Sequence, residues 1–203
     1  MKILHLDSSI LAGNSVSRTL SAKTVDHFRA GNSAAIVTYR DLAADPIPHL
    51  SGEYLGALQS AEPIHAPALQ HDLALSATVM EEFLDADIVV IGVALYNLGV
   101  PSQLKAWIDR VIVAGRTFRY TAEGQVEGLA TSKRVILNVA RGGVYSAGSP
   151  AASFEHTETF LRATFGFIGI PVEVVIAEGL AIGPDQRAAA LQQAEATIAA
   201  LAA

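Results

Sequence analysis

Short apolar runs alternate with longer helix-forming segments along the chain, and this alternation predicts an α/β fold. The apolar runs have the length and β-branched content of strands, and the segments between them contain helix formers and few breakers. The predicted strands cover residues 3–6, 35–39, 88–95, 135–140 and 172–177. The predicted helices cover residues 15–30, 66–85, a segment after Pro101, residues 151–165 and residues 184–200.

The middle of the chain carries the clearest pattern. Residues 88–95 are almost continuously apolar, which indicates a strand buried on both faces, as in a parallel sheet. The helix after Pro101 has an apolar stripe at helical spacing, formed by Leu104, Trp107, Ile108, Val111 and Ile112. Residues 41–60 contain several Pro and Gly and predict an irregular connection, whereas residues 118–129 predict a hairpin or a long loop.

Five strands alternating with five helices predict an open parallel sheet with helices on both faces. Right-handed crossovers restrict the topology, and the expected architecture is a three-layer α/β/α sandwich with the flavodoxin-like strand order 2-1-3-4-5. We expect one domain over residues 1–203. Ligands of such sheets bind beyond the carboxyl ends of the strands, which directs attention to the loops at 8–17, 95–101 and 141–149.

Composition and charge exclude several classes of protein. The 203 residues are 51% hydrophobic and 17% charged, which is too apolar for a disordered chain and suits one domain. The net charge is −6 without a basic cluster, so we expect no nucleic-acid partner. The absence of cysteine excludes disulfides, thiol nucleophiles and Cys-ligated metals. No signal peptide or membrane-length apolar run is present, so a soluble cytoplasmic protein is expected.

The first strand-end loop predicts an anion site. It contains neither the dinucleotide nor the P-loop glycine pattern, but Ser9, Ser15 and Ser17 surround the start of a predicted helix. Free backbone N–H groups and the helix dipole attract an anion there, and hydroxyls donate to phosphate oxygens. A terminal phosphomonoester suits this loop better than a pyrophosphate. The alternative is that Ser15 only caps the helix.

The other two loops carry groups suited to a flat heterocycle. Residues 95–101 offer apolar side chains and the amide of Asn97, and the alternative is a tight turn in which Tyr96 packs and Asn97 caps the next helix. Arg141, Gly142 and Gly143 allow close backbone approach and a polar contact, and the alternative there is a flexible turn. One ligand reaching all three loops makes the binding interpretation stronger than each loop alone.

Several segments occur in an order that resembles a known family, the FMN-dependent NADH azoreductases, also described as NADH:quinone oxidoreductases. These are Ser8-Ser9-Ile10-Leu11-Ala12-Gly13-Asn14-Ser15-Val16-Ser17, Tyr96-Asn97, Gln103-Leu104-Lys105, Ala114-Gly115-Arg116-Thr117-Phe118-Arg119-Tyr120, Arg141-Gly142-Gly143 and Gly166-Phe167-Ile168-Gly169. The likeness covers nearly the whole chain. It implies a flavodoxin-like homodimer with one FMN per subunit and an active site at the subunit interface.

The resemblance also implies roles for individual residues. Ser9, Ser15, Val16 and Ser17 would hold the FMN phosphate. Leu95, Tyr96, Asn97 and Leu98 would lie along the isoalloxazine, and Ala140, Arg141, Gly142 and Gly143 would close its pyrimidine side. Tyr120 and Tyr145 would line the substrate pocket. The family often has Met, Phe, Ser and His at the positions of Leu95, Leu98, Ala140 and Tyr145, so ring contacts and substrate range are expected to differ.

The implied chemistry belongs to the flavin, and no catalytic side chain or metal is expected. NADH would pass a hydride to flavin N5 and leave, and a quinone or an azo compound would then take two electrons at the same face. Arg141 or the glycine backbone could stabilise the reduced flavin at its N1–O2 edge.

Other function classes fit the sequence less well. The chain lacks the G-x-S-x-G pattern of serine hydrolases, and its six histidines show no H-E-x-x-H metal motif. The alternative from another class is a non-enzymatic flavodoxin-like module, either an electron carrier or an FMN-binding regulator. NADH consumption by the purified protein separates the two.

Overall fold

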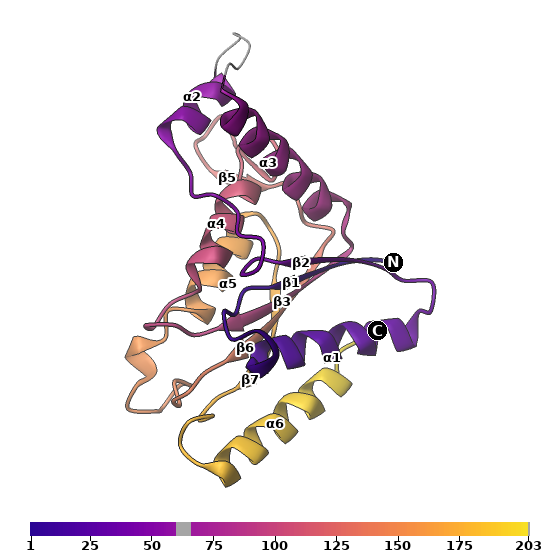
Figure 1. Cartoon of the computed structure of the whole chain (residues 1–203), viewed down its shortest axis with the longest axis vertical. Helices are drawn as coiled ribbons and strands as arrows, with labels where there is room; N and C mark the ends of the chain where they lie inside the picture. The colour runs from indigo at the N-terminus through magenta and orange to yellow at the C-terminus, as the bar shows by residue number, and fades with distance from the viewer. Residues whose placement is uncertain (60–65, 203) are drawn as a thin grey trace.

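A five-stranded parallel sheet forms the centre of the protein, as the computed structural model of residues 1–59 and 66–202 shows (Figure 1). Its strand order is β2-β1-β3-β6-β7. The strands are β1 (Lys2–Asp7), β2 (Ile36–Asp41), β3 (Ile88–Ala94), β6 (Arg134–Ala140) and β7 (Val172–Ala177). Since β4 and β5 lie outside this sheet, the order is the expected 2-1-3-4-5, and the predicted fold class is confirmed.

Helices cover both faces of the sheet, α1 and α6 on one face and α3, α4 and α5 on the other (Figure 1). The helices are α1 (Val16–Gly31), α2 (Gly52–Gln59), α3 (Pro67–Asp85), α4 (Ser102–Val111), α5 (Glu158–Phe167) and α6 (Pro184–Ala199). Short 3₁₀ turns at Ala12–Asn14 and Ala152–Phe154 precede α1 and α5. None of the helices in the described part of the chain combines the length and apolar character that crossing a membrane requires.

Successive residues of β3 face opposite sides of the sheet. Ile88 and Val90 pack with the α1–α6 cluster, whereas Val89, Ile91 and Val93 pack with the cluster under α3, α4 and α5. All seven residues of the strand are buried. Burial on both faces explains why the sequence shows a continuous apolar run here rather than an alternating one.

Two segments differ from the sequence-based expectation. The connection predicted as irregular over 41–60 contains α2, whose Tyr54 N–H donates to the capping hydroxyl of Ser51 (3.1 Å); residue 60 lies outside the described residues. The helix predicted over 151–165 is split, because the Glu155 carboxylate accepts the N–H groups of Glu158 (2.8 Å) and Thr159 (3.0 Å) and so begins a new helix. Side-chain capping, which composition does not reveal, decides both cases.

The predicted hairpin at 118–129 is present as β4 (Phe118–Tyr120) and β5 (Val126–Gly128), an antiparallel pair outside the main sheet. Phe118 packs edge-on against Phe167 at the end of α5, with ring centroids 4.8 Å apart. Gly128 lies directly against the backbone of Ile168. The hairpin is therefore fixed to the end of α5.

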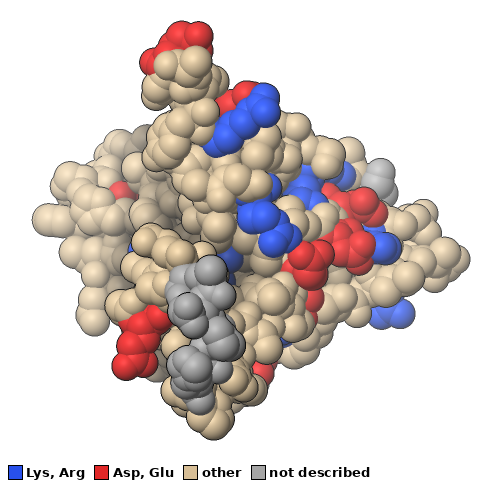
Figure 2. All heavy atoms as spheres, turned by 90° about the horizontal axis from the view of Figure 1, so that it is seen from above, with Lys and Arg blue, Asp and Glu red and all other residues tan. Residues whose placement is uncertain are grey.

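Charges of both signs are interspersed on the face seen in Figure 2. Ion pairs such as Arg116 with Glu81 (2.6 Å) and Lys105 with Asp109 (2.5 Å) place opposite charges side by side. On this face the colours form no broad patch of one sign.

Candidate functional site

The loop after β1 and the start of α1 form one wall of a cavity at the carboxyl ends of the strands. Ser8 fixes the beginning of the loop by donating its hydroxyl to the Gly92 carbonyl (2.8 Å). Arg18 holds the next residue, because its guanidinium donates to the Ser9 carbonyl (2.8 and 3.1 Å) and to both carboxylate oxygens of Asp41 (2.6 and 2.7 Å). The loop is thus fixed by strand β3 and by a bidentate ion pair.

Three buried serines follow this backbone path. The Ser9 hydroxyl lies 2.9 Å from the Tyr96 hydroxyl, and the Ser15 and Ser17 hydroxyls lie 3.0 Å apart. Ser15 also caps α1 by accepting the N–H of Arg18 (3.3 Å). The capping interpretation and the anion-site interpretation of this serine are therefore compatible.

The first two backbone N–H groups of α1 are free to meet a ligand. Among the described residues, no hydrogen bond uses the N–H of Val16 or Ser17. These N–H groups, the serine hydroxyls and the positive end of the helix dipole converge at one place. Such a set of neutral donors suits a terminal phosphate.

A tight turn after β3 forms the second wall. Tyr96 and Gly99 exchange both backbone hydrogen bonds (3.0 and 3.1 Å) across Asn97 and Leu98, whose φ angles are +46° and +71°. Non-glycine residues rarely adopt positive φ, and such strain concentrates at ligand sites. Pro101, rather than Asn97, is the N-cap residue of α4, so Asn97 is not a helix cap here.

The backbone after β6 forms the third wall. The carbonyls of Gly142 and Gly143 accept N–H groups from Ala181 (2.9 Å) and Gly179 (2.8 Å), which continues the β6–β7 pairing into the loops. Within the described residues, the N–H groups of Gly142 and Gly143 have no protein acceptor. They are available to a polar ring edge.

The Arg141 side chain points into the protein, although its backbone precedes these glycines. It is only 1% exposed, and its guanidinium is surrounded by the carboxylates of Glu155, Glu158 and Glu178. The two terminal nitrogens of this guanidinium are engaged by glutamates, and its Nε is buried without a hydrogen-bond partner among the described residues. Of the groups considered for the N1–O2 edge, the glycine N–H groups are therefore the ones that line the loop without a protein acceptor.

The structure brings most of the predicted binding residues to one cavity of about 240 Å³. Those that line it are Ser9, Ser15, Val16, Leu95, Tyr96, Ala140, Arg141 and Gly142. The Ser17 hydroxyl lies 3.0 Å from that of Ser15, Asn97 and Leu98 form the turn that follows Tyr96, and Gly143 follows Gly142. Tyr145 lines a neighbouring cavity with Arg141, and Tyr120 is 63% exposed on β4 and lines neither.

Sequence reasoning missed the contribution of the loop after β7. Leu180 and Ala181 of this loop and Arg187 of α6 line the same cavity, as do Leu11, Asn14 and Ala94. The loop follows the last predicted strand at its carboxyl end, and this topological position was the available signal.

Comparison with known proteins shows which family the chain belongs to. A sequence profile of the family described as Flavodoxin-like fold matches residues 1–202. A protein of Xanthomonas campestris pv. campestris, named FMN-dependent NADH:quinone oxidoreductase, is 60% identical over 202 residues, which are 99% of each chain. A protein of Methylorubrum extorquens with the same name is 55% identical, covering 99% of this chain and 98% of its own.

The chain belongs to this flavodoxin-like family. A solved structure, the azoreductase from Bacillus anthracis str. Sterne, superposes on the flavodoxin-like chain with a TM-score of 0.85 at 28% identity, covering 99% of this chain and all of the other. The resemblance drawn from the sequence motifs is confirmed.

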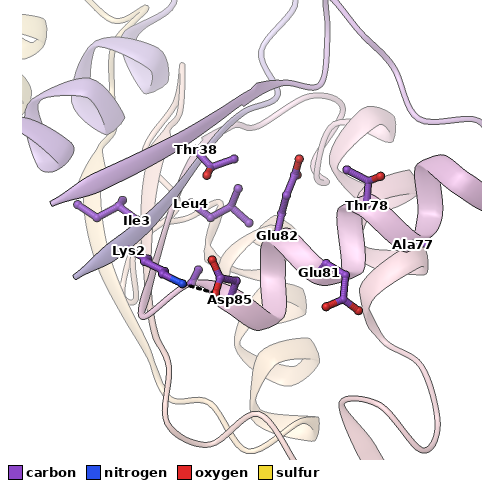
Figure 3. Close-up of a pocket in the computed structure, with 10 residues that line it drawn as sticks. Lys2, Ile3, Leu4, Thr38, Ala77, Thr78, Glu81, Glu82 and Asp85 are labelled. Carbon is purple, nitrogen blue, oxygen red and sulfur yellow. Dashed lines mark hydrogen bonds and ion pairs between the residues drawn. The ribbon is translucent and has the colours of Figure 1, made fainter.

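A second cavity of the flavodoxin-like chain lies away from the carboxyl ends of the strands (Figure 3). It has about 550 Å³ between the beginning of β1 and α3. Its carboxylates are already paired, Asp85 with Lys2 (2.5 Å), Glu82 with Arg40 (2.7 Å) and Glu81 with Arg116 (2.6 Å). Since these charges are neutralised by the chain itself, we assign the function to the strand-end cavity.

A buried carboxylate under the first loop predicts an acid-sensitive fold. Burial opposes ionisation of Asp7, but the neighbouring His5 ring and the hydrogen bonds from Ser21 and Tyr39 outweigh it and hold its pKa below the ordinary 3.8. A lowered native pKa stabilises the fold above pH 3.8, and this contribution is lost as the pH falls through the native value. Urea unfolding at decreasing pH should show this loss, and Asp7→Asn should flatten it, whereas Asp26→Asn at an exposed position should not.

Proposed function

We propose that the protein is an FMN-dependent oxidoreductase that takes electrons from NADH and passes them to quinones and to aromatic azo compounds. The relatives named FMN-dependent NADH:quinone oxidoreductase cover nearly the whole chain, and the azoreductase shares its fold. The observation that carries the proposal is the strand-end cavity, where serine hydroxyls and free N–H groups converge beside a strained turn.

The residues fit FMN at its two ends. Ser15, Ser17 and the N–H groups at the start of α1 would hold the phosphate, and Gly142 and Gly143 would donate to the polar edge of the ring. Bound FMN supplies the hydride chemistry, whereas the protein supplies binding and orientation. No side chain of this chain is assigned a proton-transfer role.

The cavity of one chain is small for the whole cofactor. Its volume of about 240 Å³ lies below the roughly 300–1,000 Å³ of typical ligand pockets. It therefore suits the phosphate and the ribityl chain, and the turn at Tyr96–Gly99 would carry the ring. A ring open on one face would admit NADH and then the acceptor in turn, as a ping-pong sequence requires.

A second copy of the chain would complete the site. An apolar groove of about 660 Å³ begins at Gly99 and Val100 and runs between α4 and α5 past Phe160 and Ala163. It adjoins the turn that would carry the ring. We propose that the homodimer forms over this groove and places the active site at the subunit interface.

The proposed dimer predicts the effect of one charge in the groove. Ala163→Glu introduces a carboxylate on the exposed face of α5, and we expect it to convert the dimer to a monomer because burying an unpaired charge is costly. Light scattering after gel filtration measures this. Ala189→Glu on the exposed face of α6 is the matched control and should stay dimeric. If the Ala163→Glu protein remains a dimer of unchanged stability, the dimer interface does not lie over this groove.

The proposed activity has a direct assay. Purified protein should be yellow, and it should oxidise NADH when a quinone such as menadione is present, and more slowly with a simple azo dye. Protein that carries FMN but is inert to NADH would be an electron carrier, which is the non-enzymatic alternative. Protein that takes up no FMN would contradict both functions.

A further inference from the structure

A buried arginine connects three segments beside the proposed ring site. The Arg141 guanidinium lies 3.0 Å from Glu155, 3.0 Å from Glu158 and 3.5 Å from Glu178. Arg141 follows β6, Glu178 follows β7, and the other two glutamates stand at the start of α5. One cation thus joins two strand ends to a helix.

Each of the three carboxylates also has donors besides Arg141. Glu155 accepts N–H groups at the start of α5, and Glu158 accepts Nε of Arg162 (2.8 Å). Glu178 accepts the N–H of Tyr145 (2.8 Å), the N–H of Ser146 (3.2 Å) and the Ser146 hydroxyl. These donors explain how three acidic groups coexist around one buried cation.

Glu178 therefore links Arg141 to the loop that contains Tyr145. Burial opposes ionisation of Glu178, but the bonds from Ser146 and Tyr145 and the charge of Arg141 outweigh it, so its pKa lies below the ordinary value. The carboxylate is charged at neutral pH and binds the loop firmly.

The bond from the backbone N–H of Tyr145 to Glu178 fixes the chain at the point from which the Tyr145 ring extends. This ring packs over Gly143, where an added Cβ would lie 3.2 Å from Cε2 of Tyr145. The opposite edge of the loop is held by the backbone bonds to Gly179 and Ala181. The free N–H groups of Gly142 and Gly143 are thus fixed between two restraints.

We propose that Arg141 is a positioning residue that acts through Glu178. The pair holds the Tyr145 ring and the N–H groups of Gly142 and Gly143 in place for the flavin edge and the incoming acceptor, and the Arg141 side chain does not touch the cofactor. This inference rests on the proposed function and adds Glu178, Glu155 and Glu158 to the residues on which the site depends.

The reduction potential of bound FMN tests this arrangement without an activity assay. Glu178→Gln keeps the shape and an acceptor oxygen but removes the charge, which weakens the bonds to Tyr145 and Arg141. Misplaced N–H donors stabilise the reduced, anionic flavin less. The affinity of the protein for reduced FMN should therefore fall about tenfold relative to its affinity for oxidised FMN. For a two-electron couple this corresponds to a potential about 30 mV more negative.

A matched control and a second variant separate positioning from general damage. Glu173→Gln removes a carboxylate from β7, the strand that Glu178 follows, where Glu173 pairs with Arg134 away from the site, and the potential should not change. Arg141→Lys keeps the charge but loses the planar fork that reaches several carboxylates, and it should shift the potential in the same direction as Glu178→Gln. The double variant should shift it little further, since both act through one link.

The outcomes distinguish positioning by Arg141 and Glu178 from the alternatives. If Arg141→Lys shifts the potential and Glu178→Gln does not, Arg141 contacts the flavin directly and the proposal fails. If neither variant shifts the potential while wild-type protein binds FMN normally, the positioning role of Arg141 is refuted and the proposed function stands. If wild-type protein takes up no FMN, both fail. Should Glu178→Gln not fold, Ser146→Ala removes one donor to Glu178 and must give a smaller shift in the same direction.

Discussion

Replacing Ser15 and Ser17 together with alanine should weaken FMN binding by about a hundredfold or more. The two hydroxyls lie 3.0 Å apart at the start of α1, next to the free N–H groups of Val16 and Ser17. A hydrogen bond to a charged group contributes about 1.5–3 kcal/mol, so two such bonds account for at least this loss. Fluorescence quenching of FMN titrated with apoprotein measures the affinity.

Two controls isolate the phosphate contact. Riboflavin lacks the phosphate, so the double variant and the wild type should bind riboflavin equally. Thr19→Ala removes an exposed hydroxyl of α1 that donates to the Ser15 carbonyl (3.1 Å), and it should leave FMN affinity unchanged. Ser15 also caps the helix, so the double variant should lose about 1 kcal/mol of unfolding free energy. Undiminished FMN affinity in folded double variant would refute the phosphate site.

Gly128→Ala should give the largest loss of stability among the glycine substitutions. An added Cβ would lie 2.3 Å from the backbone C and O of Ile168 and 2.5 Å from the N of Gly169. A backbone cannot yield as a side chain can, so the hairpin must separate from the end of α5. Overpacking of this kind costs about 1–3 kcal/mol or more. For a protein of this size each kcal/mol lowers Tm by about 2–4 °C.

Gly166→Ala is the matched control for the hairpin contact. Gly166 lies in α5, has no heavy atom within 4 Å of an added Cβ, and gains helix propensity on substitution. Its Tm should be equal to or above that of the wild type. A Gly128→Ala protein with the wild-type Tm would mean that the hairpin does not pack on α5 in solution.

The strands were predictable because the sheet is parallel and covered on both faces. Burial on both faces demands a continuous apolar run, as in β3. The edge strand β7 is only partly buried and contains Glu173, but its bounds were also predicted as residues 172–177. Helix α2 was not predictable in this way. Tyr54 is its one buried residue, and it contains two glycines, so neither periodicity nor propensity marks it. Its start depends on a single cap at Ser51.

The site was predictable where position along the backbone suffices. Topology brings the ends of β1, β3 and β6 together, so Ser15, Tyr96 and Gly142 reach one cavity. The direction of the Arg141 side chain was not predictable, because its partners stand at two places far along the chain, the start of α5 and the end of β7. No spacing rule connects Glu155 or Glu178 with an arginine after β6. Long-range pairing of charges requires the folded chain.

The turn between β3 and α4 has a consequence for engineering. Asn97 and Leu98 both occupy left-handed backbone conformations, which glycine would adopt without penalty. Leu98→Gly would relieve this penalty in the folded chain but would give the unfolded chain more freedom, and it would remove the aliphatic surface beside the ring site. Relaxing this turn to increase thermal stability would therefore loosen the side of the proposed ring site. Positions remote from the turn are better targets for stabilising substitutions.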